Sequence, residues 1–360
     1  MLNRTEEDIR KNWKKKESRT PLLSIVCLTY NHDKYIASTL DGFLMQRTNF
    51  PFEIIVHDDA STDRTMEIIK QYEKRFPNIL RPIYEKENLY SKKGGFLLLN
   101  KAIEEKAGGK YIAFCEGDDF WIKDDKLQIQ ADFLEANPEY TAVYHSVYYV
   151  KGNKIISNDK LSFYDRDVTA EEIIAGGGEF CSTPSLCFRS AYYFEKWNFK
   201  EISDIGDYPM QIILGISGKV RYMAMTAACY RVECTGSWSS RVSLDKLASV
   251  RHNKIEIKSM LELNRETERK YENSIYFHIG ICCLYLWDMD CDCLRYFFLA
   301  ARKSGRVYRK RLIKLYHRRI LKRKFTRLYK LYYFIWSEIM PAARIWIIRN
   351  RYRNITKQLG

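Results

Sequence analysis

Apolar runs that end in polar residues alternate with helix-like segments along the first third of the chain. The apolar run "LLSIVCLTY" (22–30) is followed by the polar segment "NHDKY", which predicts a buried strand and then a loop. "FEIIVHDDAST" (52–62) repeats this scheme, with a weaker strand at 79–84 and a fourth at 110–114. Helical spacing of apolar residues predicts helices over 35–46, 63–76 and 96–107 between these strands. Strands and helices that alternate in this way indicate a parallel sheet with helices on both faces.

Polar residues follow the predicted strands at the same end. Asn31 follows the first strand, Asp58 and Asp59 follow the second, and an acidic segment (116–119) follows the fourth. Ligands of such sheets gather beyond the carboxyl ends of the strands. The pattern therefore predicts half of a nucleotide-type site within residues 22–122.

The pattern changes twice further along the chain. An amphipathic helix is predicted over residues 124–136 and a strand over 141–150. A glycine-rich loop that leads into a short strand is predicted over 176–190, and an acidic cluster at the start of an apolar helix over 201–219. A last strand is expected over 220–232, and only helices from Leu244 onward. We expect a basic N-terminal arm (1–20), a main α/β domain (21–240), a helical region (241–300) and a basic amphipathic helical tail (301–360).

Charge and cysteine usage limit the class of protein. Residues 301–360 contain 19 Lys and Arg against one acid, Glu338, so this segment carries +18 and the other 300 residues carry −3. The ten cysteines show no regular framework and no apolar signal segment opens the chain, which favours a cytoplasmic location. Cys282 and Cys283 lie in an apolar helical pattern and are expected to be buried, without a metal.

Three acids crowd the loop after the fourth strand. "CEGDDFW" (115–121) contains Glu116, Asp118 and Asp119, and like charges this close repel each other unless a cation lies among them. Carboxylates without His or Cys suit Mn²⁺ or Mg²⁺ bound together with phosphates. A solvated turn is the alternative for one isolated cluster, but the second acidic strand end at 57–62 favours a site.

Three segments (24–46, 53–65 and 110–121) resemble the family 2 glycosyltransferases in order and spacing, and the resemblance extends over about residues 21–240. It implies an α/β fold of the GT-A (Rossmann-like) type, a mixed sheet with helices on both faces, here followed by an α-helical C-terminal extension. It also implies an inverting, metal-dependent transferase whose donor is a nucleotide sugar, UDP-linked in this interpretation. The acceptor would be a glycan or a lipid-linked glycan of a cell-surface polysaccharide pathway.

The resemblance assigns roles to individual residues. Thr29, Tyr30 and Asn31 would border the nucleotide and Asp59 would bind the base. Asp118 and Glu116 would hold the metal, although Glu116 departs from the Asp that is usual there, and Asp119 would orient the loop or a donor hydroxyl. Arg231 would also belong to the nucleotide-sugar site, where it would approach the diphosphate, or it would pair with a surface acid.

The acidic segment "GDYP" (206–209) matches the position of the family's catalytic base. Asp207 is therefore expected to take the proton of the acceptor hydroxyl, with Asp204 as the second choice. An acid that stabilises the helix N-terminus is the structural alternative, and both roles are compatible. A second departure is Glu233, where relatives often have His, and the region around Trp238 is expected to form a flap. His32, His57 and His145 lack metal-ligand spacing and are interpreted as structural.

The basic tail combines charge with interfacial aromatic residues. In "LKRKFTRLYKLYYFIWSEIMP" (321–341) apolar residues recur at intervals of three and four, and basic residues fill the other faces. This composition is typical of a helix that lies on an anionic membrane surface. Packing of the tail on the main domain is the alternative, and nucleic acid is not expected as a partner. We therefore expect a peripheral enzyme at the cytoplasmic face of the membrane. The alternatives are a nucleotidyltransferase and a non-catalytic, membrane-tethered binding protein of the same fold.

Overall fold

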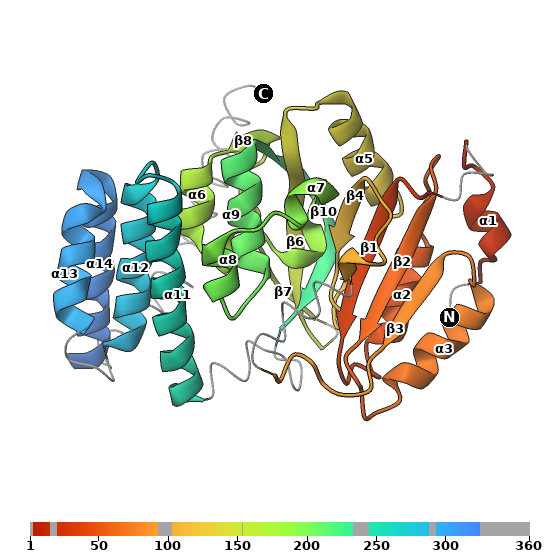
Figure 1. The fold of residues 1–360 in the computed structure, drawn as a ribbon, viewed down its shortest axis with the longest axis horizontal. Coiled ribbons are helices and arrows are strands. Elements are labelled where there is room, and N and C mark those ends of the chain that lie inside the picture. Colours follow the sequence, from red (N-terminus) through yellow and green to blue (C-terminus); the bar gives the residue numbers. More distant parts are fainter. Residues whose placement is uncertain are drawn as a thin grey trace, which may run out of the picture.

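A mixed sheet forms the centre of the molecule (Figure 1). The computed structural model describes residues 3–14, 20–92, 103–152, 154–232, 245–287 and 293–324. Among these residues ten strands pair in the order β3-β2-β1-β4-β9-β6-β10-β5, with β7 beside β6 and β8 beside β10. The strands are β1 (Leu23–Thr29), β2 (Phe52–Asp58), β3 (Leu80–Tyr84), β4 (Tyr111–Phe114), β5 (Phe120–Trp121), β6 (Tyr140–Lys151), β7 (Lys154–Asn158), β8 (Arg166–Val168), β9 (Cys187–Arg189) and β10 (Lys219–Arg231).

The first half of the sheet is parallel and the second half is mixed. β1 pairs parallel with β2 and β4, and β2 pairs parallel with β3. β9 runs antiparallel to both β4 and β6, while β10 runs parallel to β6 and antiparallel to β5. The carboxyl ends of β1, β2 and β4 therefore meet at one edge, where the polar strand ends were expected to converge.

Successive residues of the strands pack on opposite faces, as the period of two requires. On β4, Ile112 and Phe114 join one hydrophobic cluster, and Tyr111 and Ala113 join the other. The second cluster packs under α2 (Ile36–Leu44), α3 (Thr65–Arg75) and α5 (Lys126–Ala136), whereas the first packs under α6 (Ala170–Gly176) and α9 (Asp207–Ser217). Helices thus cover both faces, and the predicted fold class is confirmed.

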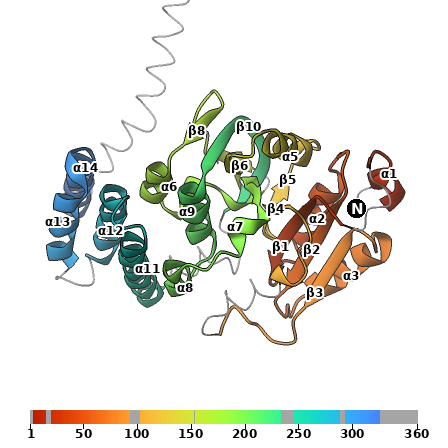
Figure 2. The same ribbon diagram turned by 45° about the horizontal axis from the view of Figure 1, so that its top comes forward.

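Among the described residues, only helices follow the last strand along the chain, as expected. In both views α11 (Lys246–Glu266), α12 (Glu272–Leu286), α13 (Cys293–Lys303) and α14 (Gly305–Lys324) stand side by side (Figures 1 and 2). α11 also packs on α8 (Asn198–Ile202), and α12 packs on α6, so these helices share the first hydrophobic cluster. Cys282 and Cys283 are buried on α12, as predicted. The division into domains stays a prediction, and residues 325–360 of the tail lie outside the described residues.

The segment before the sheet is docked rather than extended. The helix α1 (Glu6–Arg10) begins with a capping box between Thr5 and Asp8. The indole N–H of Trp13 donates to Thr48 Oγ1 (3.1 Å), and Ile9 is buried. The third expected helix, over 96–107, lies mostly outside the described residues.

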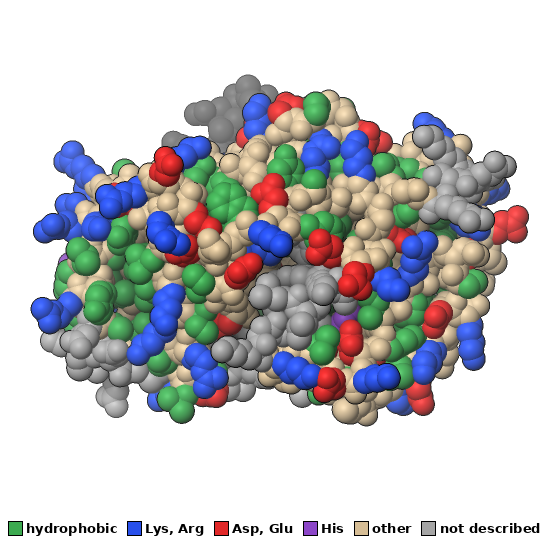
Figure 3. Space-filling view, viewed as in Figure 1, with side chains coloured by type: hydrophobic (Ala, Val, Ile, Leu, Met, Phe, Trp, Pro, Cys, Tyr) green, Lys and Arg blue, Asp and Glu red, His purple; other side chains and the backbone are tan. Residues whose placement is uncertain are grey.

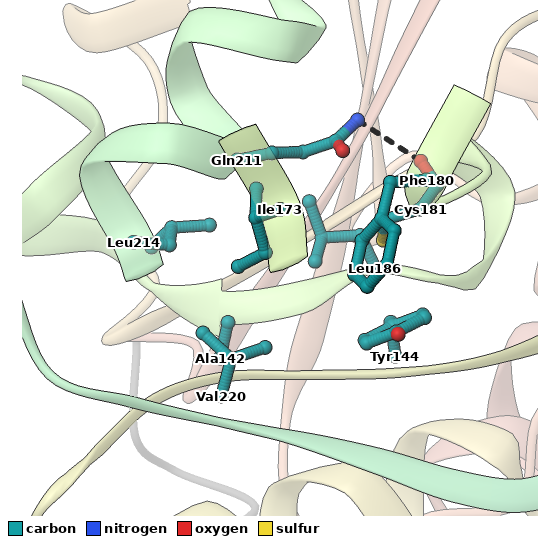
Figure 4. A pocket seen from close by; sticks show the side chains of 9 residues that line it. All are labelled: Ala142, Tyr144, Ile173, Phe180, Cys181, Leu186, Gln211, Leu214 and Val220. Carbon is teal, nitrogen blue, oxygen red and sulfur yellow. Dashed lines mark hydrogen bonds between the residues drawn. The ribbon is translucent and has the colours of Figure 1, made fainter. Parts of the chain in front are cut away.

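One small cavity lies inside the first hydrophobic cluster (Figure 4). Its volume is about 10 Å³, close to the limit for one water molecule. Side chains from β6, β10, α6 and α9 line it, and the Gln211 amide donates to the Cys181 carbonyl (3.0 Å). A cavity of this size is too small for a substrate.

Candidate active site

The loop between β4 and β5 gathers the three predicted acids. Backbone bonds from Cys115 N–H to the Val26 carbonyl (3.1 Å) and from Gly117 N–H to the Leu28 carbonyl (2.9 Å) hold this loop against β1. One carboxylate oxygen from each of Glu116, Asp118 and Asp119 lies within 4.8 Å of the others. Three hard oxygen ligands at this spacing suit a small divalent cation.

Burial and mutual repulsion disturb the charge of this cluster. Burial, then Asp118, then Asp207 raise the pKa of Glu116 to about 8. Burial and the two neighbouring carboxylates raise the pKa of Asp119 as well, and its Oδ2 is buried without a hydrogen-bond partner among the described residues. A divalent cation would offset both the repulsion and the desolvation, so the donor set fits Mn²⁺ or Mg²⁺.

Asp119 and Arg231 fix the acid loop in the sheet. The Arg231 backbone N–H donates to Asp119 Oδ1 (2.8 Å), and its guanidinium donates to the Asp118 carbonyl and to Ser38 Oγ (2.8 Å). The same guanidinium lies 4.2 Å from the centre of the Phe120 ring. Arg231 thus joins β10 and α2 to the loop, while its expected contact with the diphosphate stays a prediction.

The end of β1 supplies the next set of predicted residues. Thr29 is buried, and its Oγ1 has no hydrogen-bond partner among the described residues. Tyr30 is 38% exposed, so its ring is accessible at the sheet edge. Asn31 adopts a left-handed conformation (φ 57°), in which its Oδ1 accepts from Thr62 N–H (2.7 Å). Thr29 therefore offers a hydroxyl that no described residue binds and Tyr30 offers an accessible ring, whereas Asn31 links the two strand ends.

Asp59 lies at the same edge but is engaged by backbone. Its carboxylate accepts from Leu89 N–H (2.6 Å) and Tyr90 N–H (3.0 Å), and the side chain is buried. Both oxygens therefore anchor the segment after β3. Recognition of a base by Asp59 stays a prediction.

His32 is a site residue that sequence reasoning set aside. Its Nε2 lies 3.9 Å from Asp118 Oδ2, and its Nδ1 is buried without a hydrogen-bond partner among the described residues. Burial lowers the pKa of His32, although Asp118 opposes this shift. No second His stands at ligand spacing from His32 in the sequence, so its place one residue after Asn31, at the strand end, was the signal that indicated a site.

Asp207 is the first residue of α9. Its Oδ1 accepts from Tyr208 N–H (2.9 Å), and burial is the main cause that raises its pKa. The negative charge of Asp207 also contributes to the raised pKa of Glu116 in the acid loop. Asp204, the second choice for the base, is instead paired with His252 Nδ1 (2.8 Å). Glu233 and the expected flap around Trp238 lie outside the described residues.

We expect Gly117→Ala to distort the acid loop. An added Cβ would lie 2.5 Å from Thr29 Oγ1 and 2.8 Å from His32 Nδ1, closer than real Cβ atoms approach. Overpacking of this kind costs about 1–3 kcal/mol of unfolding free energy, so the melting temperature should fall. Gly152→Ala is the control for surrounding space, because no heavy atom lies within 4 Å of its added Cβ, although its φ of +57° adds strain of its own. Equal melting temperatures for wild type and Gly117→Ala would contradict the described loop.

The comparison with known proteins assigns the first part of the chain. Residues 24–196 match the family described as glycosyl transferase family 2. This segment is a family 2 glycosyl transferase domain. It contains Thr29, Asp59, Glu116, Asp118 and Asp119, whereas Asp207 and Arg231 lie beyond it.

Relatives of the family 2 domain occur in several bacteria. An uncharacterized protein of Mycobacterium tuberculosis (strain ATCC 25618 / H37Rv) is 35% identical over 222 residues, which is 61% of each chain. TuaG of Bacillus subtilis (strain 168), named for teichuronic acid biosynthesis, is 39% identical over 123 residues, 34% of this chain and 43% of TuaG. The crystal structure of S. aureus TarS 1–349 in complex with UDP aligns with a TM-score of 0.47 at 17% identity, over 80% of this chain and 91% of that one. The chain spans about 61% of the length of the mycobacterial relatives that it matches.

Proposed function

We propose that this chain transfers a sugar from a nucleotide sugar, UDP-linked, to a hydroxyl of a glycan or lipid-linked glycan, with inversion at the sugar carbon. One observation carries the proposal: three carboxylates converge in the β4–β5 loop of a family 2 domain. The charge of Asp207, which acts on Glu116, supports it. The teichuronic acid pathway in the name of TuaG supports a polysaccharide acceptor.

The acid loop would hold the metal. Asp118 and Glu116 are its proposed ligands, and a bound Mn²⁺ or Mg²⁺ would supply positive charge for the departing diphosphate. One oxygen of Asp119 accepts the hydrogen bond from Arg231 N–H, so Asp119 would keep the loop in place. Thr29, Tyr30, Asn31 and Asp59 would border the nucleotide, and Arg231 would support the loop beneath the diphosphate.

Asp207 would act as the general base. A sugar hydroxyl is a weak nucleophile, and a carboxylate within hydrogen-bond reach takes its proton as the new bond to the sugar carbon forms. A double displacement needs a nucleophilic carboxylate as well as the acid–base group. We assign the acids of the β4–β5 loop to the metal and Asp207 to proton transfer, which corresponds to a single displacement and inversion.

The basic end of the chain would contact an anionic membrane surface at the cytoplasmic face. Residues 293–324 contain 13 Lys and Arg and no Asp or Glu. Tyr296, Phe298 and Leu299 on α13 are 44–62% exposed. Figure 3 shows basic and hydrophobic side chains side by side at this end of the molecule, on the left. Exposed aromatics among basic residues suit a headgroup layer, and no helix of the described residues is long and apolar enough to cross a bilayer.

Metal removal tests the proposed reaction. With Mn²⁺ and a panel of nucleotide sugars, we expect release of nucleoside diphosphate with at least one donor. EDTA should reduce this release to background, and excess Mn²⁺ should restore it, because the acid loop needs a cation. Release that persists in EDTA would contradict a metal-dependent site. Pyrophosphate released from a nucleoside triphosphate and a sugar phosphate would point to a nucleotidyltransferase, and donor binding without turnover would indicate a binding protein.

A further inference from the structure

Two ion pairs lie behind the proposed base, on helices beyond the family 2 domain. His252 Nδ1 on α11 lies 2.8 Å from Asp204 Oδ1, three residues before Asp207. His278 Nε2 on α12 lies 3.2 Å from Glu256 Oε1 on α11. His252 and Glu256 are four residues apart, so they occupy the same face of α11, one turn from each other. Three ionisable groups of the helical region thus gather with Asp204 around the start of α9.

The Glu256–His278 pair is buried between α11 and α12. Glu256 is 3% exposed and His278 is 9% exposed. Neither Glu256 oxygen has a regular hydrogen bond among the described residues. A buried carboxylate is costly unless it is paired, and an apolar pair of similar size would cover α9 at least as well. Groups of this kind concentrate at functional sites.

Both pairs contact the segment that carries Asp207. The His278 ring packs on the Tyr208 ring (5.0 Å between centres), and Tyr208 N–H donates to Asp207 Oδ1. Glycine at position 177 suits the close approach of His278, because an added Cβ would lie 3.2 Å from His278 Cε1 and φ is +73°. On the other side, Ser259 Oγ donates to the Phe199 carbonyl (2.8 Å), which holds α8 against α11. The segment from Asp204 to Tyr208 is therefore fixed from two sides by α11 and α12.

We propose that α11 completes the active site: His252 and Glu256 are positioning residues that fix the segment carrying Asp207 and determine the electric field at its carboxylate. This inference rests on the proposed role of Asp207 as the base. Among the described residues, the titratable groups whose charges interact with Asp207 include Glu116 from the β4–β5 loop, Tyr230 from β10, Cys181 from the loop before β9, and His252 and Glu256 from α11.

The two positioning residues act on Asp207 in opposite directions. After burial, the negative charge of Glu256 raises the pKa of Asp207, whereas the positive charge of His252 lowers it. The Asp204 carboxylate favours the protonated form of His252 and raises the pKa of that ring, against the effect of burial. Loss of Glu256 should therefore ease the ionisation of Asp207, and loss of His252 should hinder it.

Direct titration of the Asp207 carboxyl tests this inference. The measurement is a ¹³C NMR titration of the full chain in EDTA, with the resonance assigned through Asp207→Asn. We expect Glu256→Gln to lower the pKa of Asp207 and His252→Asn to raise it. Glu262→Gln is the matched control, because Glu262 lies on the same helix and pairs with Arg265 instead. Should Glu256→Gln not fold, His252→Asn alone decides the question, since His252 is partly exposed.

The pH dependence of nucleotide release separates this inference from the proposed function. The acidic limb of the rate should move to lower pH in Glu256→Gln and to higher pH in His252→Asn, because a general base acts only when it is deprotonated. A carboxyl pKa that stays unchanged in both variants would overturn the role of α11. A carboxyl pKa that moves while the limb stays in place would overturn Asp207 as the base.

Discussion

Asp118→Asn should abolish metal-dependent release of nucleoside diphosphate. The substitution keeps the shape of the side chain but removes a charge from the cluster that binds the cation. The charge stabilisation that a metal gives a leaving group amounts to several kcal/mol, so the rate should fall by about 10³-fold or more. The measurement is the initial rate of release at saturating Mn²⁺ for wild type and variant.

The same variant should not be less stable than the wild type in EDTA. Asp118 raises the pKa of both Glu116 and Asp119, so its neutralisation relieves repulsion inside a buried loop. We expect an equal or higher melting temperature without metal, and a smaller stabilisation by added Mn²⁺. Asp132→Asn is the control, since Asp132 is exposed on α5. A variant that keeps its full rate, or that gains as much stability from Mn²⁺ as the wild type, would rule out Asp118 as a ligand.

The sheet and the position of its acids were predictable because they depend on local patterns. Apolar runs of strand length specify β1, β2 and β4, and parallel pairing then brings Thr29, Asp59 and the acid loop to one edge. The period of two along each strand also determined which residues face each layer. These features follow from neighbours within a few residues, which a single sequence contains.

The support of the site was not predictable, because it depends on contacts between distant residues. Arg231 reaches Ser38, 193 residues earlier in the chain, and Thr39 Oγ1 donates to the carbonyl of Gly117 (2.9 Å). His252 is 48 residues from Asp204, on a helix outside the family 2 domain. A pattern in the sequence identifies the charged residue but not the partner that three-dimensional packing gives it. The sequence therefore left two possible roles open for Arg231 and indicated no role for His252.

Asp207→Asn should separate donor binding from catalysis. Asn has the same shape and still accepts the Tyr208 N–H bond through its oxygen, so α9 should begin as in the wild type. An amide takes no proton from a hydroxyl, and general bases contribute about 10²–10⁴-fold to such rates. We expect the release rate to fall by this factor, while donor affinity, measured by calorimetry with Mn²⁺, stays close to that of the wild type.

This pattern differs from that of Asp118→Asn, in which metal-supported donor binding and release are lost together. The contrast follows from position, because Asp118 belongs to the carboxylates that would meet the metal, whereas Asp207 begins a helix packed against the other layer. Asp204→Asn is the matched control for charge near the site: it removes the negative charge that faces His252 but leaves the Asp207 carboxylate in place. If Asp204→Asn lost the larger share of the rate with unchanged donor affinity, the base would be Asp204. If both variants kept the wild-type rate of release, proton transfer by this acidic segment would be excluded.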